Sequence, residues 1–172
     1  TDLYFISSFF HQFKKNIRIL TESLDIHHEY IESDYSNIIK ESFTGNVHPC
    51  GRCSKNTGEL VKKYAKDNEI PIIIFGDMLA TGSQCINLQE DSLYRLNLPA
   101  SLSVGKQEIK SLIKNYNLNT FKGFGCPLLY EVHRKFPYMK KFSIQRILRE
   151  TRSGALEPGE ALDLIWSFYK IE

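Results

Sequence analysis

The sequence predicts an α/β fold in which an open parallel sheet is covered by helices. Segments with apolar residues at helical spacing alternate with short segments rich in β-branched residues, and the connections between them are brief. The clearest strand, residues 71–77, is an apolar run that ends at Gly-Asp, as strands buried on both faces do. A chain of 172 residues that is 42% hydrophobic and 24% charged can bury one core, which excludes the disordered class.

Two helices and a strand are predicted before the first cysteine pair. Residues 13–24 carry their apolar side chains on one helical face, which predicts an amphipathic helix. Residues 27–31 are a short strand candidate. The next helix ends near Phe43, and Asp34 or Ser36 suits its N-cap.

Four further helices are predicted around and after the strand at residues 71–77. They cover residues 57–68, 106–116 and 143–152, and the last begins near Pro158, because proline suits a first helical turn. The last helix is expected to bury Leu162, Ile165, Trp166 and Tyr169. A change of character near residue 119 predicts an α/β domain over residues 1–118, followed by a cysteine loop and a basic helical tail over residues 119–172.

The net charge of +2 hides an uneven distribution along the chain. Between Lys106 and Arg152, eleven lysines and arginines stand against three acidic residues, which gives about +8, whereas the segments before and after each carry about −3. This segregation indicates a basic surface that could contact a phosphate backbone. A solvated helix face is the alternative reading.

Three cysteines predict an inorganic site. Cys50 and Cys53 form a Cys-x-x-Cys pair just before a predicted helix, whose N-terminal N–H groups favour thiolates. Cys126, in a Gly-Cys-Pro loop, is the natural third ligand. Three thiolates suit either a tetrahedral zinc, with His48 or His133 as the fourth ligand, or an iron–sulfur cluster with one open iron. Reduced thiols at a helix start and a redox disulfide are the alternatives.

The fourth cysteine and the total number of cysteines bear on core packing and on the cellular compartment. Cys85 is expected to be a packed core thiol. Four cysteines in a chain of this length are too few for a disulfide framework, so a reducing cytoplasm is predicted. Because no apolar run approaches the roughly 18–20 residues that span a bilayer, no membrane partner is expected.

The loop after the predicted strand is a candidate ligand site. Glycine at a strand end lets a ligand approach the backbone, and this edge is where open α/β sheets bind ligands. Thr81, Gly82 and Ser83 offer N–H and hydroxyl donors to a phosphate. An ordinary turn is the alternative.

The basic tail is a candidate RNA surface. Arg146, Arg149 and Arg152 lie along one side of the predicted helix, and Arg134 and Lys135 precede it with aromatic residues interleaved. Cations beside aromatic rings suit the phosphates and splayed bases of RNA. The alternative is a solvated face with Arg146 paired to a local carboxylate.

Together these residues resemble the PP-loop ATPase superfamily, which is adenine nucleotide α-hydrolase-like, in a predicted archaeal-type branch similar to the iron–sulfur-dependent tRNA thiolases. The resemblance extends from about Phe13 to Leu129. It rests on Pro49-Cys50-Gly51-Arg52-Cys53-Ser54, Ile72-Ile73-Ile74-Phe75-Gly76-Asp77, Arg95-Leu96-Asn97-Leu98-Pro99, Lys106-Gln107-Glu108-Ile109 and Gly125-Cys126-Pro127. It implies a Rossmann-like sheet of the HUP/PP-loop type.

The resemblance also implies an activity. ATP with Mg²⁺, bound beside Gly76, Asp77 and Lys106, would adenylate a nucleobase carbonyl oxygen, which sulfur then replaces. Cys50, Cys53 and Cys126 would be the catalytic residues that hold a [4Fe–4S] cluster, with Zn²⁺ as the alternative metal. The basic residues of the tail would hold tRNA. A sulfur-donor protein and a second copy of the chain are further candidate partners.

The sequence departs from this family at two positions. The Ser-Gly-Gly-x-Asp-Ser loop that grips the ATP phosphates does not occur, so we expect a fragment whose N-terminal strand and loop are absent; a chain that has lost ATP hydrolysis is the other reading. Gly76-Asp77 also stands where many relatives carry Gly-His. The alternative function is a non-catalytic nucleotide- or RNA-binding α/β module with a structural metal site, and a thiol redox protein is a third.

Overall fold

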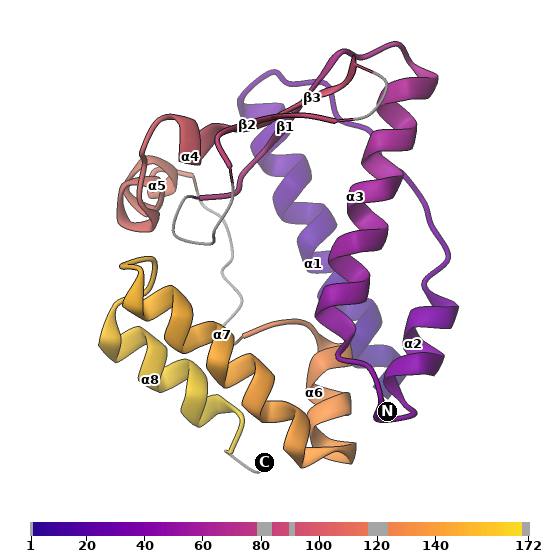
Figure 1. Ribbon diagram of the computed structural model, residues 1–172, viewed down its shortest axis with the longest axis vertical. Coiled ribbons are helices and arrows are strands. Elements are labelled where there is room, and N and C mark those ends of the chain that lie inside the picture. The colour runs from indigo at the N-terminus through magenta and orange to yellow at the C-terminus, as the bar shows by residue number, and fades with distance from the viewer. Residues whose placement is uncertain (1, 79–83, 90–91, 117–123, 170–172) are drawn as a thin grey trace.

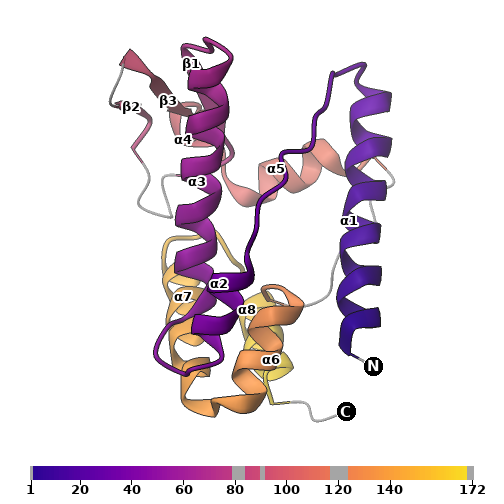
Figure 2. The same ribbon diagram turned by 90° about the vertical axis from the view of Figure 1, so that its right-hand side faces the viewer.

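The protein is mainly helical, with one small mixed sheet at one end (Figures 1 and 2). The computed structural model describes residues 2–78, 84–89, 92–116 and 124–169, with the backbone alone for residues 2–10. The expected open parallel, Rossmann-like sheet is therefore wrong. The sequence alternates predicted helices with short apolar segments, and helical proteins that contain a minor sheet show the same alternation. The alternation does not determine how many of the apolar segments pair as strands.

Three helices form the first half of the chain. They are α1 (Asp2–Ser23), α2 (Ser36–Ser42) and α3 (Pro49–Asp67). Residues 26–35 form neither helix nor strand, so the strand expected at residues 27–31 is wrong. The N-cap of α2 is Tyr35, so the expected N-cap at Asp34 or Ser36 is wrong, although the carboxylate of Asp34 accepts the Ser36 N–H at 2.8 Å.

The sheet has three strands in the order β1-β3-β2. The strands are β1 (Ile72–Phe75), β2 (Ile86–Leu88) and β3 (Tyr94–Asn97). The strand β1 is parallel to β3, with Ile74 opposite Leu96, and β2 is antiparallel to β3, with Asn87 opposite Arg95. One antiparallel pair in a sheet of this size is enough to exclude an all-parallel arrangement.

Only one face of this sheet is covered by a helix among the described residues. Ile73 is 8% exposed and packs with Ala65 of α3 and Leu93, whereas Ile74 is 59% exposed. The expectation that β1 is buried on both faces is therefore wrong. A run of isoleucines fits a strand with one covered face as well as one with two, because periodicity is lost when both alternating positions are apolar.

The second half of the chain consists of short helices. They are α4 (Leu98–Ser101), α5 (Lys106–Ile113), α6 (Pro127–Lys135), the 3₁₀ helix η3 (Pro137–Met139), α7 (Lys140–Arg152) and α8 (Pro158–Ser167). The helices α7 and α8 lie side by side (Figure 1). Their core consists of Ile147, Leu156, Ala161 and Phe168.

The expected buried face of α8 is wrong at most positions. Ala161 is buried and Ile165 is partly buried against the core, whereas Leu162, Trp166 and Tyr169 are exposed. The helix carries apolar residues on two stripes, so its sequence does not decide which stripe faces α7.

Two hydrophobic clusters lie on either side of the expected boundary at residue 119. That boundary itself lies outside the described residues. The two halves touch, because α3 and α1 both contact α6. Within the described residues no helix is long and apolar enough to cross a bilayer.

Candidate thiol site and basic groove

The Cys-x-x-Cys pair lies inside the first turn and a half of α3. Pro49 is the first residue of this helix, so Cys50 and Cys53 belong to it, whereas the sequence predicted them just before a helix that begins at Thr57. Residues three apart in a helix share a face, and the free N–H groups of the first turn lie beside them. The longer helix thus presents both thiols together at its N-terminal end.

Cys126 is held at the start of another helix by the residues around it. It is the N-cap of α6, and Gly125 before it has a φ of +93°. A Cβ atom at residue 125 would clash with Cδ2 of Leu129, which is fully buried. Glycine is therefore required here on two grounds, and it fixes the path by which the chain enters α6.

The three thiols affect one another electrostatically. Burial raises the pKa of Cys50 to about 11, and the neighbouring Cys126 and Cys53 thiols raise it as well, while Arg146 lowers it. Burial and Cys126 likewise raise the pKa of Cys53. Cys53 and Cys126, which are 73 positions apart in the chain, thus interact where α3 contacts α6.

The chemistry of this donor set fits a cationic metal or cluster. Thiolates that disfavour one another's ionisation bind a cation well, because the cation removes their mutual repulsion. The starts of two helices, α3 and α6, also bring partial positive charge to the same place. Within the described residues no three His, Cys, Asp or Glu side chains are arranged as a ligand group. The thiols are therefore neighbours that do not form a closed ligand set.

The two histidines considered as fourth ligands share a serine instead. The Oγ atom of Ser143 lies 3.2 Å from Nε2 of His48 and 3.1 Å from Nε2 of His133. His133 is 2% exposed, and burial lowers its pKa to about 4, with His48 and Lys140 acting in the same direction. Burial, followed by Arg146, also lowers the pKa of His48. Both rings are thus kept neutral, and Nδ1 of His133 is buried without a hydrogen-bond partner among the described residues.

A groove with a cavity of about 530 Å³ lies along α7. Its lining residues are Phe142, Gln145, Arg146, Leu148, Arg149 and Arg152, and we refer to it as the α7 groove. The spacing of the three arginines predicted this stripe, and the structure places all three on it. Arg146 forms an ion pair of 2.9 Å with Glu150. Neither Arg149 nor Arg152 forms an ion pair within the part of the chain that the structure describes.

Arg134 and Lys135 lie on α6 and do not line the α7 groove. Arg134 pairs with Glu131 one turn earlier. Lys135 donates to the carbonyl oxygen of Phe43 at 3.1 Å and lies over the rings of Phe43 and Phe136. The five residues expected to bind RNA therefore fall into two groups. Arg146, Arg149 and Arg152 line the α7 groove, whereas Arg134 and Lys135 make contacts elsewhere within the chain.

Of the residues expected to bind a nucleotide, Lys106 lines a second, smaller cavity, and Gly76 and Asp77 do not. Lys106 and Met78 both line this cavity of about 220 Å³, between the end of the β1 loop and the start of α5. The carboxylate of Asp77 accepts a hydrogen bond of 2.6 Å from Arg95. Gly76 has open space where a Cβ would lie, so no close backbone approach requires glycine there. Thr81, Gly82 and Ser83 lie outside the described residues.

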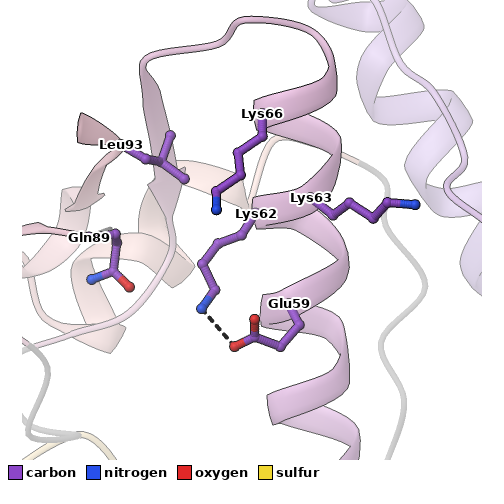
Figure 3. A pocket seen from close by; sticks show the side chains of 6 residues that line it. All are labelled: Glu59, Lys62, Lys63, Lys66, Gln89 and Leu93. Atoms are coloured by element: carbon purple, nitrogen blue, oxygen red, sulfur yellow. Dashed lines mark hydrogen bonds and ion pairs between the residues drawn. The ribbon is translucent and has the colours of Figure 1, made fainter. Parts of the chain in front are cut away.

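A third, basic cavity was not expected from the sequence. It measures about 280 Å³ and is lined by Glu59, Lys62, Lys63, Lys66, Gln89 and Leu93. Figure 3 shows Lys62 and Lys66 extending from α3 toward Gln89 and Leu93, and Lys63 extending away. Lys62 donates to Glu59 at 2.6 Å. The four-residue spacing of Lys62 and Lys66 could have indicated this cluster, which lies outside the basic segment 106–152.

The structure also places Arg146 and Ser143 at the thiol site, although the sequence assigned neither to it. Arg146 acts on both Cys50 and His48, and Ser143 joins the two histidines. No sequence signal links these residues to the cysteines, because they belong to separate helices. Cys85 is half-buried and donates to the carbonyl oxygen of Ala100 at 3.5 Å.

One comparison with known proteins gives a relative. An uncharacterized protein of Methanocaldococcus jannaschii is 34% identical to this chain over 149 residues, which cover 87% of this chain and 56% of the relative. The chain thus spans about half the length of that protein. No protein-family model matches the chain. No solved structure matches it either.

Proposed function

We propose that this chain is the sulfur- and RNA-handling part of an ATP-dependent enzyme that thiolates nucleobases in tRNA. One observation carries the proposal: Cys126 raises the pKa of both Cys50 and Cys53, and Arg146 of the α7 groove acts on Cys50. The three thiols and the arginine stripe of the α7 groove therefore adjoin, which supports a proposal of sulfur transfer to RNA.

The three cysteines would hold the inorganic group. A [4Fe–4S] cluster supplies an open iron that can hold a sulfur atom, whereas zinc would give a structural site. Cys50 and Cys53 present their thiols from one helix face, and Cys126 presents its thiol from the start of α6. Arg146 lowers the pKa of Cys50 and so opposes the burial that favours its neutral thiol, and a bound cation would favour the thiolate forms further.

The α7 groove would hold the RNA. Arg149 and Arg152 form no ion pair with a described residue, so their guanidinium groups can contact phosphates without first breaking one. Arg146 would lie nearest the thiols, because it acts on Cys50. The groove thereby leads the polyanion to the sulfur site.

ATP would bind near Met78 and Lys106, in the cavity of about 220 Å³ between the β1 loop and α5. The ammonium of Lys106 is 4.0 Å from Glu160, a long ion pair that a phosphate could replace. Gly76 and Asp77 precede Met78 in the chain and do not line this cavity. Adenylation of the nucleobase oxygen is proposed for the enzyme as a whole.

The test is the metal and sulfide content of the protein purified without oxygen. We expect brown protein with iron and acid-labile sulfide, and loss of both on Cys53→Ser or Cys126→Ser. The matched control, Cys85→Ser, removes a half-buried thiol that donates to the carbonyl oxygen of Ala100, and it should keep the full content. Colourless protein without iron, whatever else it binds, would contradict the sulfur-transfer proposal.

A non-catalytic RNA-binding module with a structural zinc is the second candidate. The observation that favours it is the 2.6 Å ion pair between Asp77 and Arg95, which occupies a carboxylate expected to serve nucleotide chemistry. This candidate predicts one zinc per chain and RNA binding that ATP does not change. Release of pyrophosphate from ATP in the presence of tRNA would exclude it.

A further inference from the structure

Phe142 is the aromatic side chain that lines the α7 groove. It is 42% exposed, and it shares the groove with Gln145 and the three arginines. The ring is exposed on the same face of α7 as Arg149 and Arg152, which form no ion pair with a described residue. The arrangement of ring and cations is the one that binds unpaired nucleotides.

Phe142 also contacts the residue that precedes the cysteine-bearing helix α3. Its ring lies edge to face with His48, at 6.0 Å between centroids, and His48 is the residue that precedes α3 and its cysteines. Ser143, the next residue, lies 3.2 Å from His48. Phe142 is therefore the part of the groove surface that adjoins the cysteine-bearing end of α3.

We propose that Phe142 stacks on an unpaired base and so selects single-stranded RNA at the α7 groove. This inference rests on the proposed RNA-binding function and adds its substrate class. Base faces are hidden inside an A-form duplex, whereas loops and ends offer them to aromatic side chains. A stacked base at Phe142 would lie beside His48, at the end of the groove that faces Cys50 and Cys53.

Lys141 occupies part of this surface in the free protein. Its ammonium lies 4.9 Å from the centroid of the Phe142 ring. A cation–π contact between two exposed side chains is weaker than the stacking of a base on an aromatic ring. The incoming base displaces the ammonium, which then has a phosphate of the same strand as its partner.

An acidic peptide is the competing occupant of an arginine-rich groove. Carboxylates would pair with Arg149 and Arg152 equally well, but they have no flat apolar face to cover Phe142. The exposed ring therefore favours RNA over an acidic peptide, and polyglutamate serves as the probe for the alternative.

The test measures fluorescence anisotropy with a labelled single-stranded RNA oligonucleotide and with the same oligonucleotide in a duplex. We expect the wild-type protein to bind the single strand at least tenfold more tightly. Phe142→Leu should weaken single-strand binding about tenfold and leave duplex binding within twofold. Phe142→Tyr should restore single-strand binding, because a tyrosine ring also stacks.

Salt dependence and a control variant separate stacking from charge effects. Phe142→Leu should leave the slope of log affinity against log salt unchanged, because no phosphate contact is lost. Trp166→Leu removes an exposed aromatic ring of α8 that does not line the groove, and it should have no effect. Full binding by Phe142→Leu, or equal wild-type affinity for both RNA forms, would overturn this inference alone.

Two other results would contradict more than the stacking of a base on Phe142. Polyglutamate that displaces the RNA at an equal concentration of charges would overturn base recognition and favour a peptide groove. Failure of the wild-type protein to bind any RNA would overturn the proposed RNA-handling role together with this inference. The metal content of the cysteine site would be untouched by either result.

Discussion

Arg146 on α7 acts on the thiol of Cys50 at the start of α3. Burial raises the pKa of this thiol to about 11, and the guanidinium of Arg146 opposes that rise. Arg146 is also paired with Glu150 at 2.9 Å, and its guanidinium lies 5.4 Å from the centroid of the Phe124 ring. A side chain held in this way connects the cysteines of α3 with the basic stripe of α7.

Replacing Arg149 and Arg152 with glutamine should weaken RNA binding and its salt dependence together. Each lost phosphate contact lowers the salt slope for single strands by about 0.7, so the double variant should lose about 1.4. Arg18→Gln, which removes one positive charge from α1, is the control for charge, because Arg18 pairs with Glu22 on that helix. An unchanged slope in the double variant would show that the α7 groove does not carry the RNA.

Replacing Gly125 with alanine should destabilise the protein by about 1–3 kcal/mol, because residue 125 has a positive φ and a Cβ would clash with Leu129. Gly58→Ala is the matched control. It lies within α3 with no atom near the added methyl, and should stabilise the protein by about 0.5–1 kcal/mol. Urea unfolding of both variants checks the pair, and equal effects would refute this role for Gly125.

His133 should make the protein less stable in acid. Its pKa is about 4 in the folded protein, against an ordinary value of 6.5, so the unfolded chain binds the extra proton between these values. The contribution to stability is complete above pH 6.5 and is lost as the pH falls toward 4, with a slope of at most about 1.4 kcal/mol per pH unit. His133→Leu should flatten that part of the stability profile. A parallel profile for the variant, measured by urea unfolding, would argue against a neutral His133.

Alanine substitutions at the neighbouring residues Ile73 and Ile74 of β1 should differ sharply in their cost to the free energy of unfolding. Ile73→Ala opens a cavity under α3 and should cost about 2–5 kcal/mol. Ile74→Ala removes an exposed side chain and should cost less than about 1 kcal/mol. A large loss from Ile74→Ala, measured by thermal unfolding, would show that the second face of the sheet is covered in solution.

The sequence predicted most helices because their signals are local. Three-to-four spacing located α5, α7 and the second half of α1, which begins at Asp2 and not near Phe13, and Pro158 located the start of α8. It placed α3 too late, since the polar residues between Cys50 and Thr57 carry no apolar stripe. It could not determine the covered face of β1 or α8, because in each the apolar residues occupy more than one face.

The cysteine spacing and the arginine stripe were both present in the sequence, and they define the candidate chemistry without any coordinates. Their proximity was decided by tertiary structure alone. Whether Cys126 approaches α3, and whether Arg146 lies beside Cys50, depends on how α6 and α7 pack against the first half of the chain. That packing comes from burial of apolar side chains distant in sequence, which no local pattern encodes.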